Sequence, residues 1–141
     1  TRFKTDSQIT CWQVNDFTLS QIEMDCSKAA SSYGFVVRDG NGTIKNSVLK
    51  SDPTKASSYG GATYFYEQAR VLMEACRVEG YFGIHAVGKS YAEAKNCQIV
   101  APGGCYCTTD IDPVQSKIIA EKCTWAGKKE AMQEGATLIE R

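Results

Sequence analysis

The residues best equipped for chemistry in this chain are its cysteines, which form disulfides, bind metal ions or act as nucleophiles according to their spacing and surroundings. No Cys-x-x-Cys pair occurs, and this argues against a zinc ribbon and against a thioredoxin-like redox site. Cysteines spread over the whole chain are typical of a disulfide framework, and their odd number leaves one thiol free or paired with another chain. The disulfide candidates are Cys11, Cys26, Cys76, Cys97, Cys105, Cys107 and Cys123.

The connectivity of these cysteines is open. Cys26 and Cys76 fall on the apolar faces of two predicted helices, where they act either as half-cystines or as small hydrophobic side chains. Cys105 and Cys107 share one face of an extended segment, so we expect them to find separate partners. A bridge in the C-terminal third would stabilise the fold by roughly 2–4 kcal/mol.

His85 is the only histidine, and its two candidate roles are a general base beside a cysteine nucleophile and a metal ligand. One histidine is too few for most metal sites, and no cysteine lies in a glycine-flanked turn before a helix. We therefore expect a structural histidine and no catalytic residue. The alternative is a secreted hydrolase that uses His85 or a pair of carboxylates.

Three glutamates near the C-terminus are candidates for the paired carboxylates of a glycosidase. Glu121, Glu130 and Glu134 lie among several lysines, and Lys117 precedes Glu121 by four residues. This spacing is typical of ion pairs along a solvated helix, and we favour that interpretation. We expect neither a metal ion nor a cofactor.

Two further patterns concern the surface. The sequence Asn41-Gly42-Thr43 is an N-glycosylation sequon at a predicted hairpin tip, although Asn-Gly also favours the turn itself. Tyr59, Tyr64 and Tyr66 come just before or at the start of a predicted helix. Exposed tyrosines on a rigid element suit protein recognition, so these three are a candidate contact surface, with cover over a core edge as the alternative.

Composition excludes several classes of partner. Sixteen basic and sixteen acidic residues cancel over 141 residues, so we expect no nucleic acid partner. No apolar run approaches the ~20 residues that cross a bilayer, so we expect no membrane insertion. The length suits a single domain, 1–141. A start at Thr1 rather than Met, together with the cysteines, predicts a processed, secreted, extracellular protein.

The elements that would position these residues are clearest over the segment 61–89. Apolar residues recur at spacings of four, three and four from Phe65 to Cys76, which predicts a helix. Gly80 would end this helix, and a strand is predicted over 81–87. Together these elements form the second half of the predicted core.

The first half of the core repeats this pattern. A strand over 7–14 precedes a helix over 18–33, and a hairpin around Gly40-Asn41-Gly42 follows. The order strand, helix, strand, strand, helix, strand predicts an α+β fold, a four-stranded antiparallel sheet with helices on one face in the ferredoxin-like βαββαβ order. The core spans about 7–101, and a disulfide-stapled helical extension spans about 102–141. No internal repeat is evident.

A small, neutral, cysteine-rich domain with this order of elements resembles the secreted effectors of plant-pathogenic fungi. It is most similar to the Leptosphaeria avirulence-and-suppressing effector family and the related extracellular effectors of leaf-mould fungi. The resemblance rests on the two cysteine-bearing helices, the hairpin and the late cysteines, and it covers about residues 7–125 as a layout. Killer toxins with a ferredoxin-like layout are a second resemblance.

The resemblance implies a disulfide-held sheet backed by helices and a virulence or avirulence protein without enzymatic activity. It implies binding to a host protein that modulates plant immune recognition, in the apoplast or after translocation into host cells. We expect a monomer, with a disulfide-linked dimer through the odd cysteine as the alternative. A secreted hydrolase and a killer-type antimicrobial toxin are the alternative functions.

Overall fold

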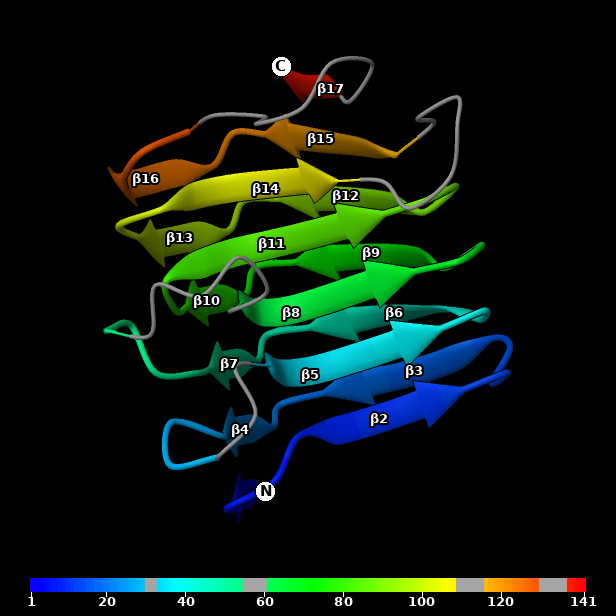
Figure 1. Ribbon diagram of the computed structural model, residues 1–141, viewed down its shortest axis with the longest axis vertical. Helices are drawn as coiled ribbons and strands as arrows, with labels where there is room; N and C mark the ends of the chain where they lie inside the picture. The colour runs from blue at the N-terminus through cyan, green and yellow to red at the C-terminus, as the bar shows by residue number, and fades with distance from the viewer. Residues whose placement is uncertain (30–32, 55–60, 109–115, 130–136) are drawn as a thin grey trace.

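A computed structural model describes residues 1–29, 33–54, 61–108, 116–129 and 137–141, with the backbone alone for 105–108. Over these residues the chain forms strands and no helix. All strand pairings among them are parallel. The predicted α+β fold with an antiparallel ferredoxin-like sheet is therefore wrong. The chain instead coils into a parallel β-helix whose walls are three parallel sheets (Figure 1).

The three sheets share the strands in rotation. Sheet A contains β1 (Arg2–Lys4), β4 (Glu23–Asp25), β7 (Val48–Lys50), β10 (Arg77–Glu79), β13 (Gln98–Ala101) and β16 (Thr124–Gly127). Sheet B contains β2 (Ile9–Trp12), β5 (Tyr33–Arg38), β8 (Gly61–Tyr66), β11 (Phe82–Val87) and β14 (Gly104–Thr108). Sheet C contains β3 (Phe17–Ser20), β6 (Asn41–Lys45), β9 (Arg70–Glu74), β12 (Tyr91–Lys95), β15 (Lys117–Glu121) and β17 (Thr137–Glu140).

One turn of the coil, here called a rung, passes through sheet B, then sheet C, then sheet A. In Figure 1 sheet B faces the viewer, sheet C lies behind it, and the coil rises from the N-terminus at the bottom to the C-terminus at the top with a right-handed sense. Neighbouring rungs stack in register, so that Asn41, Arg70 and Tyr91 are Cα partners on three successive strands of sheet C. Residues far apart in the sequence therefore lie side by side at the strand spacing of about 4.8 Å.

The corner between sheets C and A depends on one backbone conformation. The residue after each strand of sheet C has a positive φ of 48° to 54° in every rung from β3 to β15. The residues at this position are Gln21, Asn46, Ala75, Asn96 and Lys122. A second corner, between sheets B and C, has positive φ at Gln13, Asp39, Glu67 and Gly88. These left-handed residues turn the chain sharply enough for each rung to close.

The same corner bears on the helix that was predicted over 62–79. Side chains alternate inward and outward along each strand, so Val71 and Met73 face the core. The left-handed Ala75 then adds one residue, and the next inward side chains are Cys76 and Val78. The predicted helical stripe combined Phe65, Ala69 and Cys76, which do face the core, with Leu72, which faces outward into the groove on sheet C. The corner bears on the helix predicted over 18–33 in the same way, because Gln21 adds the same step between Leu19 and Ile22.

Of the other predicted elements, two strands are confirmed, and the hairpin and the described parts of the helical extension are wrong. The strand over 81–87 is confirmed by β11, and the strand within 7–14 by β2. A turn does lie around Gly40, but it joins sheet B to sheet C, so the predicted hairpin is wrong. The described parts of the predicted helical extension are strands β14 to β17 rather than helices.

The core fills the inside of the coil as one continuous column. Its largest fully buried apolar side chains come from all three sheets, and they are Phe35, Phe65, Ile44, Leu49, Met73, Ile84, Ile99, Ile118, Val37, Val71 and Val78. Burying one such side chain stabilises the folded state by roughly 1.5–3 kcal/mol relative to leaving it exposed to water. The inward position after the left-handed residue recurs every 21 to 29 residues, at Ile22, Ser47, Cys76, Cys97 and Cys123. The chain thus contains a structural repeat.

Within the described residues, no helix is long and apolar enough to span a membrane.

Candidate functional site

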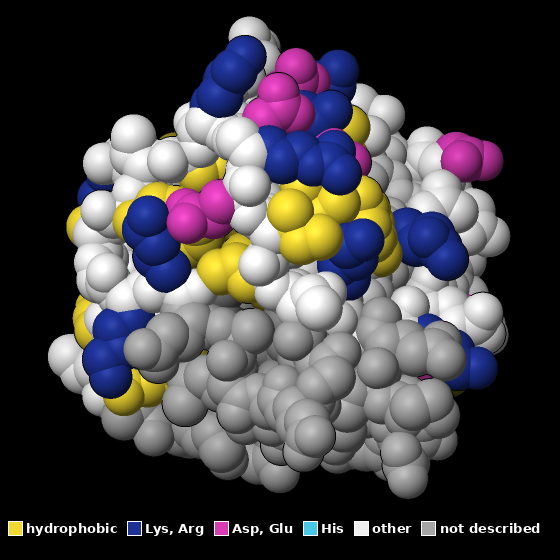
Figure 2. Space-filling view, turned by 90° about the horizontal axis from the view of Figure 1, so that it is seen from above, with side chains coloured by type: hydrophobic (Ala, Val, Ile, Leu, Met, Phe, Trp, Pro, Cys, Tyr) yellow, Lys and Arg dark blue, Asp and Glu magenta, His cyan; other side chains and the backbone are white. Residues whose placement is uncertain are grey.

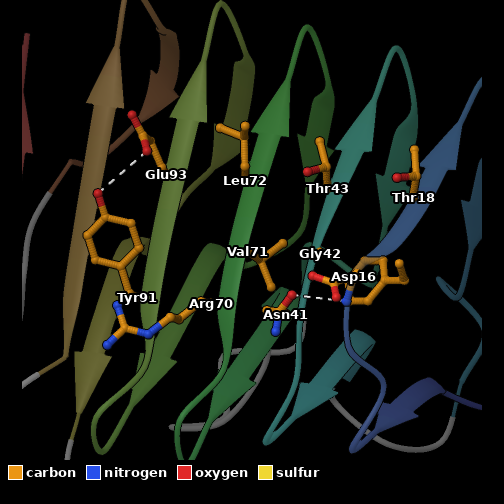
Figure 3. A pocket seen from close by; sticks show the side chains of 11 residues that line it. Asp16, Thr18, Asn41, Gly42, Thr43, Arg70, Val71, Leu72, Tyr91 and Glu93 are labelled. Carbon is orange, nitrogen blue, oxygen red and sulfur yellow. Dashed lines mark hydrogen bonds between the residues drawn. The ribbon is translucent and has the colours of Figure 1, made fainter.

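An open groove of about 440 Å³ runs across the outer face of sheet C (Figure 3). We call it the sheet C groove. Its lining crosses four successive rungs, from β3 to β12, and mixes charged, hydroxyl and aromatic side chains. The lining residues are Asp16, Phe17, Thr18, Asn41, Gly42, Thr43, Arg70, Val71, Leu72, Tyr91 and Glu93.

Strand register brings these residues together. Thr18, Thr43, Leu72 and Glu93 are partners on successive strands and form one outward column. Asn41, Arg70 and Tyr91 form a second column two residues earlier on each strand. Figure 3 shows both columns standing on the same face of the sheet. The groove thus presents a rectangular array of side chains, spaced by about 4.8 Å between rungs and about 6.6 Å along each strand.

Asn41 fixes the N-terminal end of the groove. Its Oδ1 accepts a hydrogen bond from the Asp16 amide at 2.9 Å, and its Nδ2 donates to Asn15 Oδ1 at 3.0 Å. The sequon Asn41-Gly42-Thr43 therefore lies within a strand and lines the groove, instead of forming a hairpin tip. A glycan on Asn41 would replace the bond to Asn15 and occupy the groove, and glycosylation there stays a prediction.

Arg70 supplies the positive charge of the groove. Its side chain is exposed and makes no ion pair with any residue that the structure describes. Glu93 carries negative charge on the next rung, where Lys95 Nζ approaches its carboxylate at 3.1 Å and the Tyr91 hydroxyl lies 3.5 Å away. Burial, with the charge and hydrogen bond of Glu93, raises the pKa of Tyr91 above its usual value.

The floor of the groove depends on a glycine. A Cβ at Gly42 would overlap the ring of Phe17 on the neighbouring strand. The Phe17 ring packs edge-on against Phe35 of sheet B, with ring centroids 6.3 Å apart. Gly42 therefore leaves room for an aromatic ring between the groove and the core.

Sequence reasoning singled out only Asn41 of the groove residues, and for a different reason. Asp16, Thr43, Arg70 and Glu93 stand 23 to 27 residues apart in the chain, and no short motif links them. The detectable signal was the recurring corner position described above. Counting outward residues from that corner in each rung aligns the groove residues in columns.

Three of the disulfide candidates form a column at the corner between sheets C and A. We call Cys76, Cys97 and Cys123 the thiol ladder. Each Sγ lies near two carbonyl oxygens, one on its own rung and one on the previous rung, at 3.3–3.6 Å. The amide of Cys76 donates to Cys97 Sγ at 3.5 Å, as the amide of Ile22 donates to Ser47 Oγ at 3.3 Å. The thiols thus fill the role that the Ser47 hydroxyl has one rung earlier.

The three thiols of the ladder differ in pKa, and so in how readily they lose their proton. A hydrogen bond with Cys97 Sγ lowers the pKa of Cys76 to about 7, and the alternative hydrogen bond with Cys97 Sγ lowers the pKa of Cys123 to about 7, since the single Cys97 proton can bond only one of these sulfurs at a time. Interaction with the sulfurs of its two neighbours, together with burial, raises the pKa of Cys97. Cys97 is therefore the thiol that keeps its proton.

The other cysteines lie apart from this column. Cys11 points inward from β2 and is half-buried, and Cys26 is buried at the end of β4. Neither Cys26 nor Cys76 lies on a helix. The five cysteines whose side chains are described are free thiols, and burial raises the pKa of Cys11 and of Cys26.

Two disulfide candidates stay untested. Cys105 and Cys107 lie on β14, with side chains outside the described residues. The disulfide framework is therefore still a prediction for these two positions.

His85 lies in the middle of β11 and is fully buried. Its ring stands edge-on to Tyr64, with centroids 4.8 Å apart, and Phe82 lies at 6.2 Å. Tyr64 and Tyr66 are half-buried neighbours on β8 with rings 5.1 Å apart. Of the three candidate contact tyrosines the structure therefore brings Tyr64 and Tyr66 together, and Tyr59 lies outside the described residues.

Of the three predicted carboxylates, the structure describes Glu121 alone. Glu121 ends β15 and lies 3.9 Å from Lys95, while Glu130 and Glu134 are outside the described residues. In the described part of the chain no group of three or more His, Cys, Asp or Glu side chains is arranged to hold a metal ion.

The C-terminal end of the coil, which Figure 2 views from above, shows hydrophobic side chains interrupted by charged ones. The Lys129 ammonium lies 5.8 Å from the centre of the Trp125 ring and 3.1 Å from the carboxylate of Glu140. This end is therefore closed partly by charged side chains.

No family model matches this chain, and no curated protein or solved structure is significantly similar to it.

Proposed function

We propose that this protein is a carbohydrate-binding module, and that the sheet C groove holds a neutral oligosaccharide without cleaving it. The observation that carries the proposal is the mixture of hydrogen-bonding types in the groove. Arg70 can only donate, the carboxylates of Asp16 and Glu93 can only accept, and the threonine hydroxyls do both. A ligand must match all three types along one face.

Hydroxyl groups match this mixture best, because each one both donates and accepts. A polyanion would set its own oxygens against Asp16 and Glu93, and a polyamine would set its ammonium groups against Arg70. A chain rich in hydroxyl groups meets neither conflict. The open shape of the groove and its length over four rungs, about 14 Å from first to last, suit several linked sugar units.

A peptide fits the groove less well. An extended peptide commonly binds by adding a strand to a free sheet edge, but the groove crosses the outer face from β3 to β12, and of these four strands β6, β9 and β12 are paired on both edges. Stable protein interfaces also need an apolar centre. The apolar side chain that projects into the groove from the columns is Leu72, surrounded by polar neighbours (Figure 3).

The spacing of the carboxylates argues for binding without hydrolysis. Asp16 and Glu93 stand three rungs apart, or about 14 Å. Retaining and inverting glycosidases hold their two carboxyl groups roughly 5–9.5 Å apart. These two side chains therefore lie too far apart to act on one glycosidic bond.

The test is titration calorimetry with neutral, uronic acid and amino-sugar oligosaccharides of equal length. We expect the neutral ligand to bind, and Arg70→Ala to weaken it about tenfold or more, because hydrogen bonds to a charged group contribute about 1.5–3 kcal/mol. Arg77→Ala, which removes an arginine from sheet A, is the matched control and should leave affinity unchanged.

The secreted effector with a host protein partner, expected from the layout, remains the alternative proposal, although the layout itself is not the observed one. A protein from host tissue that binds the wild type, and loses binding when the groove is altered, would favour that alternative over carbohydrate. Binding of uronic acid chains in preference to neutral ones would contradict the donor and acceptor argument.

A further inference from the structure

Cys97 and Cys123 occupy the same corner position on two consecutive rungs. Each directly precedes the first residue of a sheet A strand, and those first residues, Gln98 and Thr124, are Cα partners. The amide of Thr124 donates to the Cys97 carbonyl at 2.9 Å. The two cysteines are therefore stacked at the rung spacing of about 4.8 Å, within the Cα range of about 4.4–6.8 Å that disulfides require.

We propose that Cys97 and Cys123 form a redox-active thiol pair that closes to a disulfide when the protein meets a low-molecular-weight disulfide such as oxidised glutathione. The inference does not rest on carbohydrate binding, because neither cysteine lines the sheet C groove.

The pairing of the neighbouring strands favours a bridge between Cys97 and Cys123 over one between Cys76 and Cys97. Closing a bridge between stacked residues must draw the two Cβ atoms from the rung spacing to about 3.5–4.5 Å. Among the described strands β16 is the last of sheet A and pairs only with β13, so the strand that follows Cys123 has one free edge and can shift. β10, which follows Cys76, is held between β7 and β13, and the rung that holds Cys76 cannot shift as easily.

Access selects the same pair. Cys123 is half-buried, whereas Cys76 and Cys97 are each only 2% exposed. A soluble disulfide can therefore reach Cys123 first. The lowered pKa of Cys123 also supports its role as the attacking thiolate, because the thiolate is the reactive form.

The reaction balances in two exchange steps. The Cys123 thiolate attacks one sulfur of oxidised glutathione, forms a mixed disulfide and releases one glutathione thiolate. The Cys97 thiol then loses its proton and attacks Cys123 Sγ, which forms the Cys97–Cys123 bond and releases the second glutathione thiolate. Two cysteine thiols are oxidised, and one glutathione disulfide is reduced.

The bridge would tie the rung of β14, β15 and β16 to the one before it. It closes the segment 98–122, which includes β14 and β15, and Cys97 lies on the rung of β12, the last of the four rungs that line the groove. We expect the oxidised protein to resist proteolysis at its C-terminal end better than the reduced protein. Reduction with dithiothreitol would reverse this protection.

The test is a tryptic peptide map of the native protein after exposure to oxidised glutathione, followed by blocking of free thiols. Cleavage after lysines places Cys97 in peptide 96–117, with Cys105 and Cys107, and Cys123 in peptide 123–128. We expect these two peptides to be joined with the loss of two hydrogen atoms. Fragmentation should place the bond at Cys97, and Cys76 should carry the blocking group.

Serine variants provide the controls, because Ser47 shows that a hydroxyl is accommodated at this corner. Cys97→Ser and Cys123→Ser should each abolish the joined peptide, while Cys76→Ser should leave it unchanged. Bonding of Cys123 to Cys105 or Cys107, a bridge from Cys76 to Cys97, or two free thiols at equilibrium with oxidised glutathione would each overturn the proposal. The wild-type map alone decides among these outcomes.

Discussion

Replacing Ala75 by Asn should stabilise the protein, because Ala75 occupies a left-handed corner with φ of 51°. The equivalent residues on the neighbouring rungs are Asn46 and Asn96, with φ of 48° and 52°. The amides of all three residues donate to a carbonyl oxygen of the following rung at 2.9–3.0 Å, so the backbone at this corner is the same. An asparagine at 75 therefore needs no rearrangement of the chain.

The size of the effect follows from the cost of this conformation. A residue with a Cβ pays about 1–2 kcal/mol in the left-handed region. Asparagine is several-fold enriched there, which corresponds to about 1 kcal/mol of relief. Ala75→Asn should therefore raise the free energy of unfolding by about 0.5–1 kcal/mol and the midpoint of thermal unfolding by about 1–4 °C. Ala75→Gly should gain less, because glycine loses about 0.5–1 kcal/mol of chain entropy on folding.

Urea denaturation followed by circular dichroism measures these differences. The matched control is the reverse change one rung earlier, Asn46→Ala, which should lose a similar amount. Ala75→Val should be the least stable variant, because a β-branched residue is a true outlier at positive φ. A less stable Ala75→Asn variant, or a more stable Asn46→Ala variant, would refute the account of the corner.

The remaining predictions concern other contacts of the coil. Gly127→Ala should cost about 1–3 kcal/mol, because φ is 117° and a Cβ would overlap the Ala101 carbonyl oxygen; thermal unfolding measures this, and an unchanged midpoint would contradict it. Cys76→Ala should cost about 1–3 kcal/mol more than Cys76→Ser, because Cys76 Sγ accepts the Ser47 amide and alanine leaves that donor buried; equal urea midpoints would contradict it. The hydrogen bond from Ser27 Oγ to Asp25 at 2.6 Å lowers the pKa of Asp25, so Ser27→Ala should cost about 1–2 kcal/mol at pH 7. That cost should shrink as the pH falls below about 4 and Asp25 becomes protonated, and a cost that is the same at pH 7 and pH 2 would contradict the assignment.

The sequence was sufficient to locate individual strands and turns. Strand composition over 81–87 marked β11, and glycine with asparagine marked the corner at Gly40. Both signals are local, since β-branched and aromatic residues favour extended backbone and glycine favours tight turns. Local signals of this kind carry over to any fold that uses the segment as a strand or turn.

The global arrangement was not predictable in the same way. The spacing of Phe65, Ala69, Leu72 and Cys76 looks helical unless Ala75 is known to be left-handed and Leu72 to face outward, and alanine gives no sign of that conformation. Rungs of unequal length, 21 to 29 residues between corners, also concealed the repeat. With the repeat hidden, four neighbours such as Thr18, Thr43, Leu72 and Glu93 had no visible connection.

The cysteines illustrate what composition alone could not locate. Their number suggested bridges spread along the chain, whereas Cys76, Cys97 and Cys123 share one corner, where a small side chain with a hydrogen-bonding atom contacts carbonyl oxygens of its own and the previous rung. Ser47 meets the same requirement with a hydroxyl group. The repeated environment, rather than the count of cysteines, explains these three positions.

The central claim is that the sheet C groove binds a neutral oligosaccharide, and an NMR titration of the isotopically labelled protein tests it most directly. We predict that backbone amide shifts move first along the groove columns, around Thr43, Arg70 and Glu93, while the amides of Val48 and Arg77 on sheet A stay unchanged. The perturbed residues should trace one continuous band across β3, β6, β9 and β12. Perturbations confined to sheet A or sheet B, or no change at millimolar ligand, would contradict the account.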